Sequence, residues 1–244
     1  MIRAGLGRSL YLAQKEILSF FGSSLPPLTL GLIAFLCGLL SALLAGSPGA
    51  TYEEVTRIIF HFFYVIALMA GLFLTMSSFV AEKKQGTMEL LFTLPVSNVE
   101  IVLGKFLAYV SLLAVTLLLM TLVYVVGIAE APWYIALSGC LGLLLVAAYA
   151  VAIGMFASSL TDNYLLALLV GSIILIAIDI GGFMGGLLPA PAREMVSYFH
   201  GLNQFTPFTR GLLPLKSSTF FAGLCIFFLF LTSRILDSRH WRRS

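Results

Sequence analysis

Gly104-Lys105 is the only Gly-Lys pair in this sequence and its only candidate for a phosphate cradle. A P-loop has the spacing G-x-x-x-x-G-K-[S/T], because glycine amides surround the phosphates and the final hydroxyl binds Mg²⁺. Here Val99 stands where the first glycine belongs, and Phe106 stands where the hydroxyl residue belongs. We therefore expect no nucleotide cofactor to bind this chain itself.

The other residues that could do chemistry are scattered. His61, His200 and His240 lie far apart in the sequence, and the three cysteines lie singly inside apolar runs. This pattern lacks the spacing of a zinc site, a disulfide framework or a nucleophile elbow. We expect no catalytic residues and no metal site, and we therefore do not expect the chain to be an enzyme.

The composition points to a bilayer instead. Of the 244 residues, 60% are hydrophobic and 10% are charged, and the mean hydropathy is +1.04. Soluble domains carry roughly 25% charged residues, because they need polar side chains to cover their surface. The predicted fold class is therefore an all-α integral membrane protein with a single transmembrane domain over residues 1–244.

Six apolar segments reach the length of about 20 residues that a bilayer requires. They are expected near residues 25–45, 58–80, 101–128, 133–158, 164–187 and 219–236. Six spans place both termini on one side, which then holds ten of the 14 Lys and Arg residues. The ten are Arg3, Arg8, Lys15, Lys83, Lys84, Lys105, Arg234, Arg239, Arg242 and Arg243. The positive-inside rule assigns that side to the cytoplasm of a cytoplasmic (inner) membrane. Because these charges flank apolar segments, we expect lipid headgroups, not nucleic acid, as their partners.

Residues 1–22 form an expected amphipathic helix before the first span. Its apolar positions recur at helical spacing and fall within an arc of about 100° on a helical wheel. They are Ile2, Leu6, Leu10, Ala13, Ile17, Phe20 and Phe21. Such a helix lies on the membrane surface with its basic residues near the headgroups. A soluble helix packed on a partner is the alternative.

Asp179 is the one acidic residue deep in an expected span. Placing it at the bilayer centre costs about 2.5–3.5 kcal/mol on insertion scales, so it should face protein or water. It either lines a polar path or a seam between subunits, or it lies near the outer water level beside Gly181 and Gly182. The outer connection over residues 189–218 is likewise either a re-entrant gate or a lid packed on the helix ends.

The polar stretch over residues 81–100 has internal organisation. Gly86 allows a sharp reversal, and Thr87 can cap a short helix over residues 88–94. That helix ends before Pro95, which disfavours helical geometry in the preceding residue. Ser97 and Glu100 have the spacing of a capping box that starts the third span. The short helix is apolar at positions 90–92 and 94 although it lies outside the bilayer, which favours a protein partner over a plain capped loop.

The same stretch resembles the segment after the second span of type 2 ABC exporter permeases. The matching patterns are Glu82-x-x-x-Gly86-Thr87-x-Glu89, Thr93-x-Pro95-Val96-Ser97, Gly104-Lys105, Phe208-x-Arg210-Gly211 and Trp241-Arg242-Arg243. The six spans, the amphipathic first helix and the long outer connection match as well. Within the family, the resemblance favours the branch associated with gliding motility and with maturation of nitrous-oxide reductase.

This resemblance implies partners that the residues alone do not. A short coupling helix would dock on a separate ATPase, two ATPase subunits would bind ATP and Mg²⁺, and a second permease, identical or homologous, would complete the path. The residues implied in coupling are Glu82, Gly86, Thr87, Glu89, Leu90, Leu91 and Pro95. The rival classes are a secondary transporter driven by an ion gradient, which would need more intramembrane charge than Asp179, and a membrane scaffold or assembly subunit. Co-purification of an ATPase would discriminate among the three.

Overall fold

The computed structural model describes residues 52–87, 97–127, 133–184 and 199–241, together with Pro189, residues 9 and 11–18, and five positions between 31 and 43. This part of the chain is helical and contains no strand, which confirms the all-helical prediction. Its elements are α3 (Tyr52–Thr75), α4 (Val80–Gln85), α6 (Asn98–Gly127), α7 (Trp133–Leu160), α8 (Tyr164–Met184), α10 (Gly201–Phe205), the 3-10 helix η2 (Phe208–Arg210) and α11 (Leu215–Trp241).

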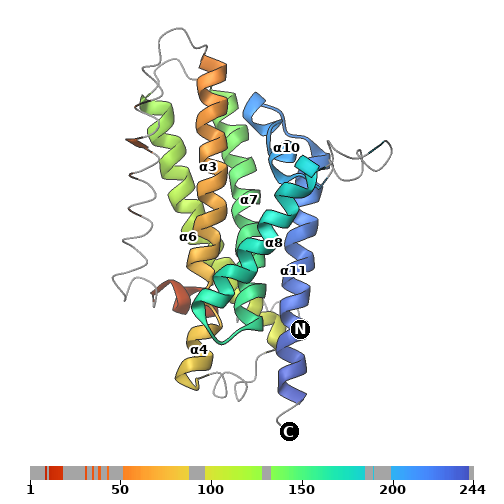
Figure 1. The fold of residues 1–244 in the computed structure, drawn as a ribbon. Coiled ribbons are helices and arrows are strands. Elements are labelled where there is room, and N and C mark those ends of the chain that lie inside the picture. The colour runs from red at the N-terminus through yellow and green to blue at the C-terminus, as the bar shows by residue number, and fades with distance from the viewer. Residues whose placement is uncertain are drawn as a thin grey trace.

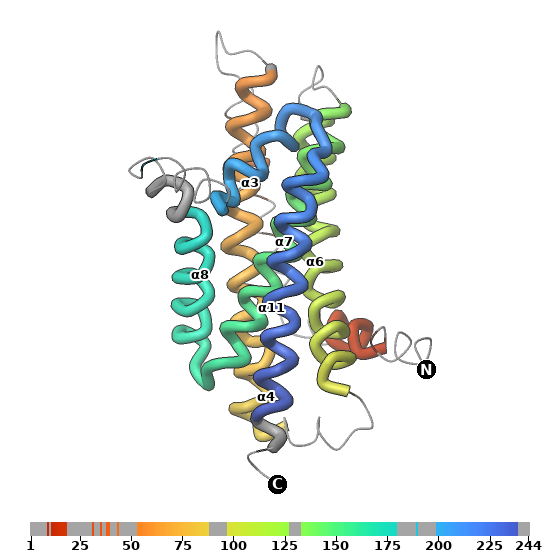
Figure 2. Tube along the Cα trace, turned by 90° about the vertical axis from the view of Figure 1, so that its right-hand side faces the viewer, coloured from red at the N-terminus to blue at the C-terminus, as the bar shows by residue number. Residues whose placement is uncertain are grey.

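The long helices run along one common direction and form a bundle (Figure 1). Helix α7 lies at its centre, and it packs against α3, α6, α8 and α11 (Figure 2). The sequence of α7 suits this place, because it is apolar all round and rich in small residues, and it is buried along most of its length. A helix that is hydrophobic on every face belongs in the interior.

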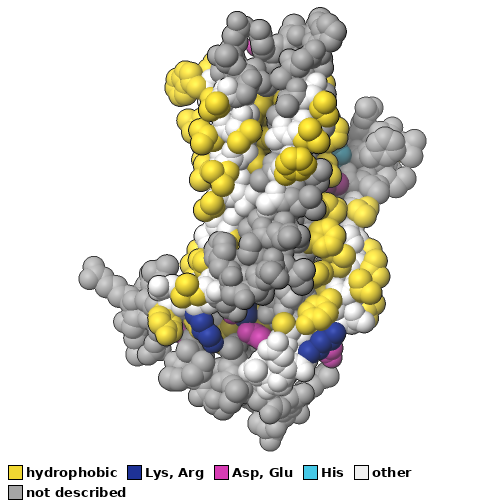
Figure 3. All heavy atoms as spheres, turned by 90° about the vertical axis from the view of Figure 1, so that its left-hand side faces the viewer, with side chains coloured by type: hydrophobic (Ala, Val, Ile, Leu, Met, Phe, Trp, Pro, Cys, Tyr) yellow, Lys and Arg dark blue, Asp and Glu magenta, His cyan; other side chains and the backbone are white. Residues whose placement is uncertain are grey.

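The outer helices expose apolar side chains in stripes. On α6 the exposed residues Val115, Leu118, Leu122 and Val126 recur every three or four positions, which is one face of a helix. Figure 3 shows apolar side chains over most of the height of one side, with the visible Lys and Arg side chains at the lower end. This distribution is typical of a surface that faces lipid along its length and water at its end.

Four described helices are long and apolar enough to cross a membrane. They span Glu53–Gln85, Asn98–Val126, Trp133–Leu160 and Leu215–Ser238, and they correspond to the expected second, third, fourth and sixth spans. The expected fifth span corresponds to α8, whose 21 residues rise about 31 Å. The expected first span lies mostly outside the described residues, so the count of six stays a prediction. The protein is a multi-pass membrane protein.

The expected second span is not one uninterrupted helix. Residues 76–79 form turns between α3 and α4. The Ser158 hydroxyl of α7 accepts hydrogen bonds from the amides of Phe79 (2.9 Å) and Val80 (3.3 Å), and it donates to the carbonyl of Met76 (3.2 Å). A side chain from a neighbouring helix thus satisfies the backbone groups that the interruption frees, which is what burial demands.

The segment over residues 199–214 folds back onto the bundle. Phe205 and Phe208 are fully buried, and the hydroxyl of Ser138 on α7 donates to the carbonyl oxygens of Phe208 (2.6 Å) and Leu212 (3.0 Å). Phe208 lies over Gly142, where a Cβ would come within 2.7 Å of its ring. Gly142 is nine residues into α7, so the segment reaches about 13 Å along that helix. The two expected arrangements, a re-entrant gate and a lid packed on the helix ends, both stay predictions.

Residues 11–18 form a short helix that we call the N-terminal helix. It lies beside the end of α6 that is nearest to α4 (Figure 2). Ala13 is buried, while Tyr11 and Leu18 are largely exposed. Only part of the expected amphipathic helix over residues 1–22 is described, and its position on a membrane surface stays a prediction.

Candidate functional site

The expected coupling segment starts where α4 ends. Three of its assigned residues are described, namely Glu82, Gly86 and Thr87. The other four, Glu89, Leu90, Leu91 and Pro95, lie outside the described residues, as does the helix expected over residues 88–94. The described part of the segment is therefore its two ends, residues 82–87 and 97–100.

Gly86 ends α4 and reverses the chain. Its φ of 69° lies in the left-handed region, where glycine meets no Cβ penalty. The amide of Gly86 donates to the carbonyl of Lys83 (3.3 Å), and the amide of Thr87 donates to the carbonyl of Glu82 (3.1 Å). These two bonds make a Schellman cap. The expected reversal is confirmed, and the Thr87 hydroxyl adds a bond to the Glu82 carbonyl at 3.4 Å.

Glu82 takes part in a buried group of charges at the start of the segment. The Lys105 ammonium lies 2.8 Å from Glu82 Oε1 and 2.9 Å from Glu16 Oε1 of the N-terminal helix. The Lys105 side chain is 4% exposed, that of Glu82 15% and that of Glu16 29%. Lys105 also lies over the ring of Phe79, 5.5 Å from its centroid. One ammonium thus joins α4, α6 and the N-terminal helix.

Lys83, the next residue along α4, joins this helix to α7. Its ammonium donates to the carbonyl oxygens of Ser158 (3.1 Å), Ser159 (2.9 Å) and Thr161 (2.7 Å), and it lies 3.4 Å from Asp162 Oδ1. The first two carbonyls belong to the end of α7 and the third to the residue that follows it, where backbone acceptors lack helical partners and a positive charge is stabilising. Lys83 therefore fixes the start of the segment to the central helix.

The far end of the segment is capped and tied as well. The Ser97 amide donates to Glu100 Oε2 (2.9 Å), and the Glu100 amide donates to the Ser97 hydroxyl (3.3 Å). This is the predicted capping box. In the next position, the Asn98 side chain donates to Asp237 Oδ1 of α11 at 2.6 Å. The coupling segment is thus held to α6, α7 and α11 by side chains that flank residues 88–96.

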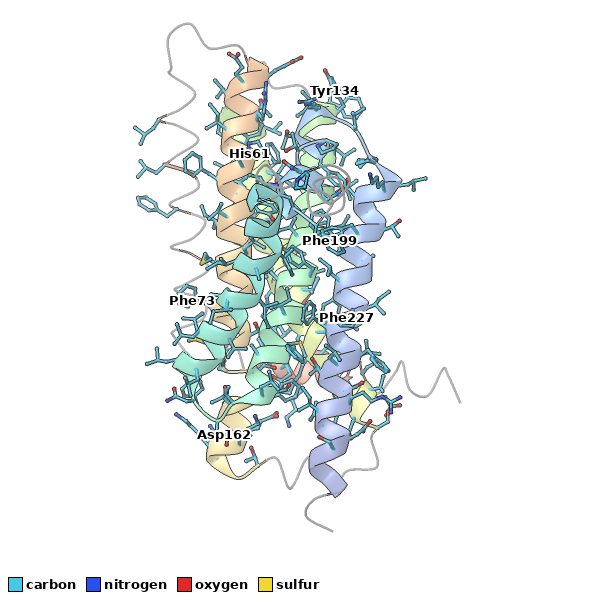
Figure 4. The ribbon with its side chains drawn as sticks, turned by 45° about the vertical axis from the view of Figure 1, so that its right-hand side comes forward. His61, Phe73, Tyr134, Asp162, Phe199 and Phe227 are labelled. Atoms are coloured by element: carbon cyan, nitrogen blue, oxygen red, sulfur yellow. The ribbon has the colours of Figure 1, made fainter. Side chains whose placement is uncertain are left out.

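Asp179 lies far from this region, toward the opposite end of the bundle. The Tyr64 hydroxyl of α3 donates to Asp179 Oδ1 at 2.8 Å, and the backbone amides of Gly201 and Leu202 also interact with the carboxylate. A Cβ at Gly201 would lie 2.6 Å from Asp179 Oδ1, so the start of α10 approaches the carboxylate closely. In Figure 4, His61, Tyr134 and Phe199 mark this end of the molecule, and Asp162 marks the end with Lys83. Asp179 thus joins α3, α8 and α10, and a role in lining a path stays a prediction.

Sequence reasoning missed the partners of Lys105 and Lys83. Both lysines were counted among the ten basic residues on the cytoplasmic side, and Lys105 was also used as part of a short family pattern. One available signal was that Lys105 falls within an expected span, where a charge needs a partner. Nothing in the sequence, however, indicates that Glu16 and Glu82 are those partners, because the three residues meet only in the folded chain.

A comparison with family models identifies the class of this protein. Residues 41–233 match the family described as ABC-2 family transporter protein, which covers most of the chain. A search of curated proteins found no match. The narrower resemblance to the gliding-motility and nitrous-oxide-reductase branch is not tested by this match. The chain belongs to the ABC-2 transporter family and is a membrane-embedded permease of an ABC transporter.

Proposed function

We propose that this chain is one of two permease subunits of an ATP-driven exporter in a cytoplasmic membrane, with both termini in the cytoplasm. Two ATPase subunits bind ATP and Mg²⁺ and dock on the segment over residues 82–100. A second permease, identical or homologous, completes the translocation path. The family match supports the transporter class, and the remaining statements extend it.

The observation that carries this proposal is the way both ends of the coupling segment are held. Lys83 ties its start to the end of α7, and Asn98 ties its far end to α11. A force applied between these points is delivered to two long helices that also pack against each other. A loop that only joined two spans would not need side-chain bonds to other helices at both ends.

The transport cycle follows from this connection. When two ATPases close on ATP, they displace the coupling segment, and α7 and α11 move with its two ends. The remaining helices pack on α7, so the bundle rocks as a unit between states that open to opposite sides. This chain binds the ATPase and moves with it, while ATP is hydrolysed in the ATPase.

Co-purification tests the docking directly. We expect Glu89→Lys and Gly86→Val each to reduce the ATPase recovered with a tagged chain by roughly tenfold, because few residues dominate such interfaces. Gly86→Val acts through its backbone, since φ at this position is 69°. The control is Glu53→Lys, which makes the same charge change at an exposed position at the other end of α3. Undiminished recovery with both Glu89→Lys and Gly86→Val would refute docking at this segment.

A further inference from the structure

Lys105 and its two carboxylate partners, Glu16 and Glu82, connect three elements of the fold. Lys105 comes from α6, and its two carboxylate partners come from α4 and from the N-terminal helix, at 2.8 and 2.9 Å. The lysine is almost completely buried, so removing either acid leaves a positive charge with less compensation in a poorly solvated place. The three elements are therefore linked through one ammonium group.

The backbone next to Lys105 brings the N-terminal helix into close contact with α6. A Cβ at Gly104 would lie 2.8 Å from Leu12 Cβ and 3.0 Å from the carbonyl oxygen of Ser9. Glycine at this position thus lets the two helices approach closely, as small residues do where membrane helices cross. The close approach is what allows Glu16, one turn further along, to reach the Lys105 ammonium.

The opposite face of the N-terminal helix is exposed. Tyr11, Gln14, Lys15 and Leu18 recur at helical spacing, and all four are exposed. Gly104 and Lys105 of α6 meet the inward face, where Ser9 and Ala13 are buried. The pair between Glu16 and Lys105 is therefore a specific polar link on the face that holds this helix to the bundle.

We propose that Lys105 is a positioning residue that makes the N-terminal helix move together with the start of the coupling segment. This inference rests on the proposed function, because the motion it transmits is the one that the ATPase imposes. Two neighbouring residues of α4 then transmit that motion to different helices. Lys83 carries it to α7, and Glu82 carries it through Lys105 to Glu16 and the N-terminal helix.

The link itself is tested on the full-length chain in lipid nanodiscs by hydrogen–deuterium exchange. Glu16→Gln removes one carboxylate charge and leaves the pair between Lys105 and Glu82. We expect the exchange of residues 11–18 to rise by roughly tenfold, with α7 unchanged. Gln14→Ala changes an exposed position of the same helix, and it should alter the exchange by less than about twofold. Equal exchange in the Glu16→Gln variant and the unaltered chain would overturn the link.

The transmission is tested in the complex with the co-purified ATPase, with and without ATP and vanadate. In the unaltered chain we expect the nucleotide to change the exchange of residues 82–87 and 11–18 together. In Glu16→Gln and Lys105→Met, the response should persist at residues 82–87 and disappear at 11–18. Lys105→Arg should retain both responses, because arginine keeps the charge and the donors. Lys83→Met is the matched control, and it should leave the response of residues 11–18 intact.

The outcomes separate three possibilities. If Lys105 has only a structural role, Glu16→Gln and Lys105→Met raise the exchange of residues 11–18 by the same factor with and without nucleotide. The nucleotide would then still change the exchange of these residues, and this result would overturn the proposal. A response of residues 11–18 in Glu16→Gln equal to that of the unaltered chain would overturn it as well. If no ATPase co-purifies with any variant, the proposed function fails, and the nanodisc measurement still decides whether Lys105 holds the N-terminal helix.

Discussion

At the residue scale, the carboxylate of Asp179 connects parts of the chain that are distant in sequence. It accepts a hydrogen bond from Tyr64 of α3 and interacts with the backbone at the start of α10. An acid in an apolar helix needs such partners, because burying it alone in a bilayer is costly. The two functions expected for Asp179, lining a path or stabilising the protein near its outer end, make different predictions for substitutions.

We predict that Asp179→Leu lowers the free energy of unfolding by about 1–3 kcal/mol, because it leaves the Tyr64 hydroxyl and the amides of α10 without their acceptor. Asp179→Asn keeps one acceptor oxygen and should cost less than half as much. Thermal denaturation of the purified chain in nanodiscs measures both. The control is Tyr11→Phe, which removes an exposed hydroxyl and should be neutral.

The same variants address the path. If Asp179 lines it, Asp179→Asn lowers transport-coupled ATP hydrolysis while assembly with the ATPase is retained. If ATP hydrolysis and assembly are unchanged in Asp179→Asn, the role of the carboxylate is limited to holding the 199–214 segment in place. A larger loss of stability in Asp179→Asn than in Asp179→Leu would contradict the hydrogen-bonding account altogether.

Local residue pairs were predictable from the sequence, and distant ones were not. The capping box of Ser97 and Glu100 and the reversal at Gly86 depend on neighbours in the chain, so short patterns specify them. The group of Glu16, Glu82 and Lys105 depends on how three elements pack. Many basic residues and many acids could have paired in principle, and spacing does not choose among them.

At the scale of elements, the contact between α3 and α7 depends on glycine. A Cβ at Gly154 of α7 would clash with the hydroxyl of Thr75 and lie 3.1 Å from its Cβ. That hydroxyl is buried, and it donates to the carbonyl of Gly71 at 2.6 Å, so Thr75 has little freedom to move aside. Small residues allow membrane helices to approach closely in this way. Gly154 therefore permits the close packing of α3 and α7.

We predict opposite effects for two Gly→Ala substitutions. Gly154→Ala should lower the free energy of unfolding by about 1–3 kcal/mol, because the added methyl group overpacks the contact with Thr75. Gly223→Ala on α11 meets no atom within 4 Å, so it should be neutral or stabilising by up to about 1 kcal/mol through helix propensity. Thermal denaturation under identical conditions measures both. Equal shifts in the two variants would mean that propensity, not packing, governs these positions.

Element types were easier to predict than their interruptions. Long apolar runs predicted α6, α7 and α11 well, because a bilayer leaves few alternatives to a helix of that length. The turns at residues 76–79 had no such signal, since the residues around them are apolar or small. The break depends on the Ser158 hydroxyl, which reaches it from another helix.

At the scale of the whole molecule, one end holds more of the described basic side chains than the other: Lys15, Lys83, Lys84, Lys105 and Arg234 against Arg57, Arg210 and Lys216. The N-terminal helix, α4 and the end of α11 lie there together (Figure 1). The groups around Lys83 and Lys105 belong to the same end. Positive-inside bias therefore predicts that this end faces the cytoplasm. The opposite end carries the start of α3 and the 199–214 segment.

This orientation is testable with single cysteines in a background that lacks the three natural ones. We predict that a membrane-impermeant maleimide added to intact cells labels Glu53→Cys and Arg210→Cys. Gln85→Cys and Ser238→Cys should react only after the membrane is permeabilised. All four positions are exposed, so burial does not decide the result. The reverse labelling pattern would invert the topology.

The bonds that hold the coupling segment have an evolutionary consequence. Lys83, Asn98 and Lys105 all lie outside residues 88–96, and their partners are on other helices. The amino acids of residues 88–96 can therefore change while the contacts at both ends of this stretch are kept. Substitutions within this short stretch alone could change which ATPase such a permease binds. Lineages could diverge in partner choice while inheriting the same transmembrane bundle.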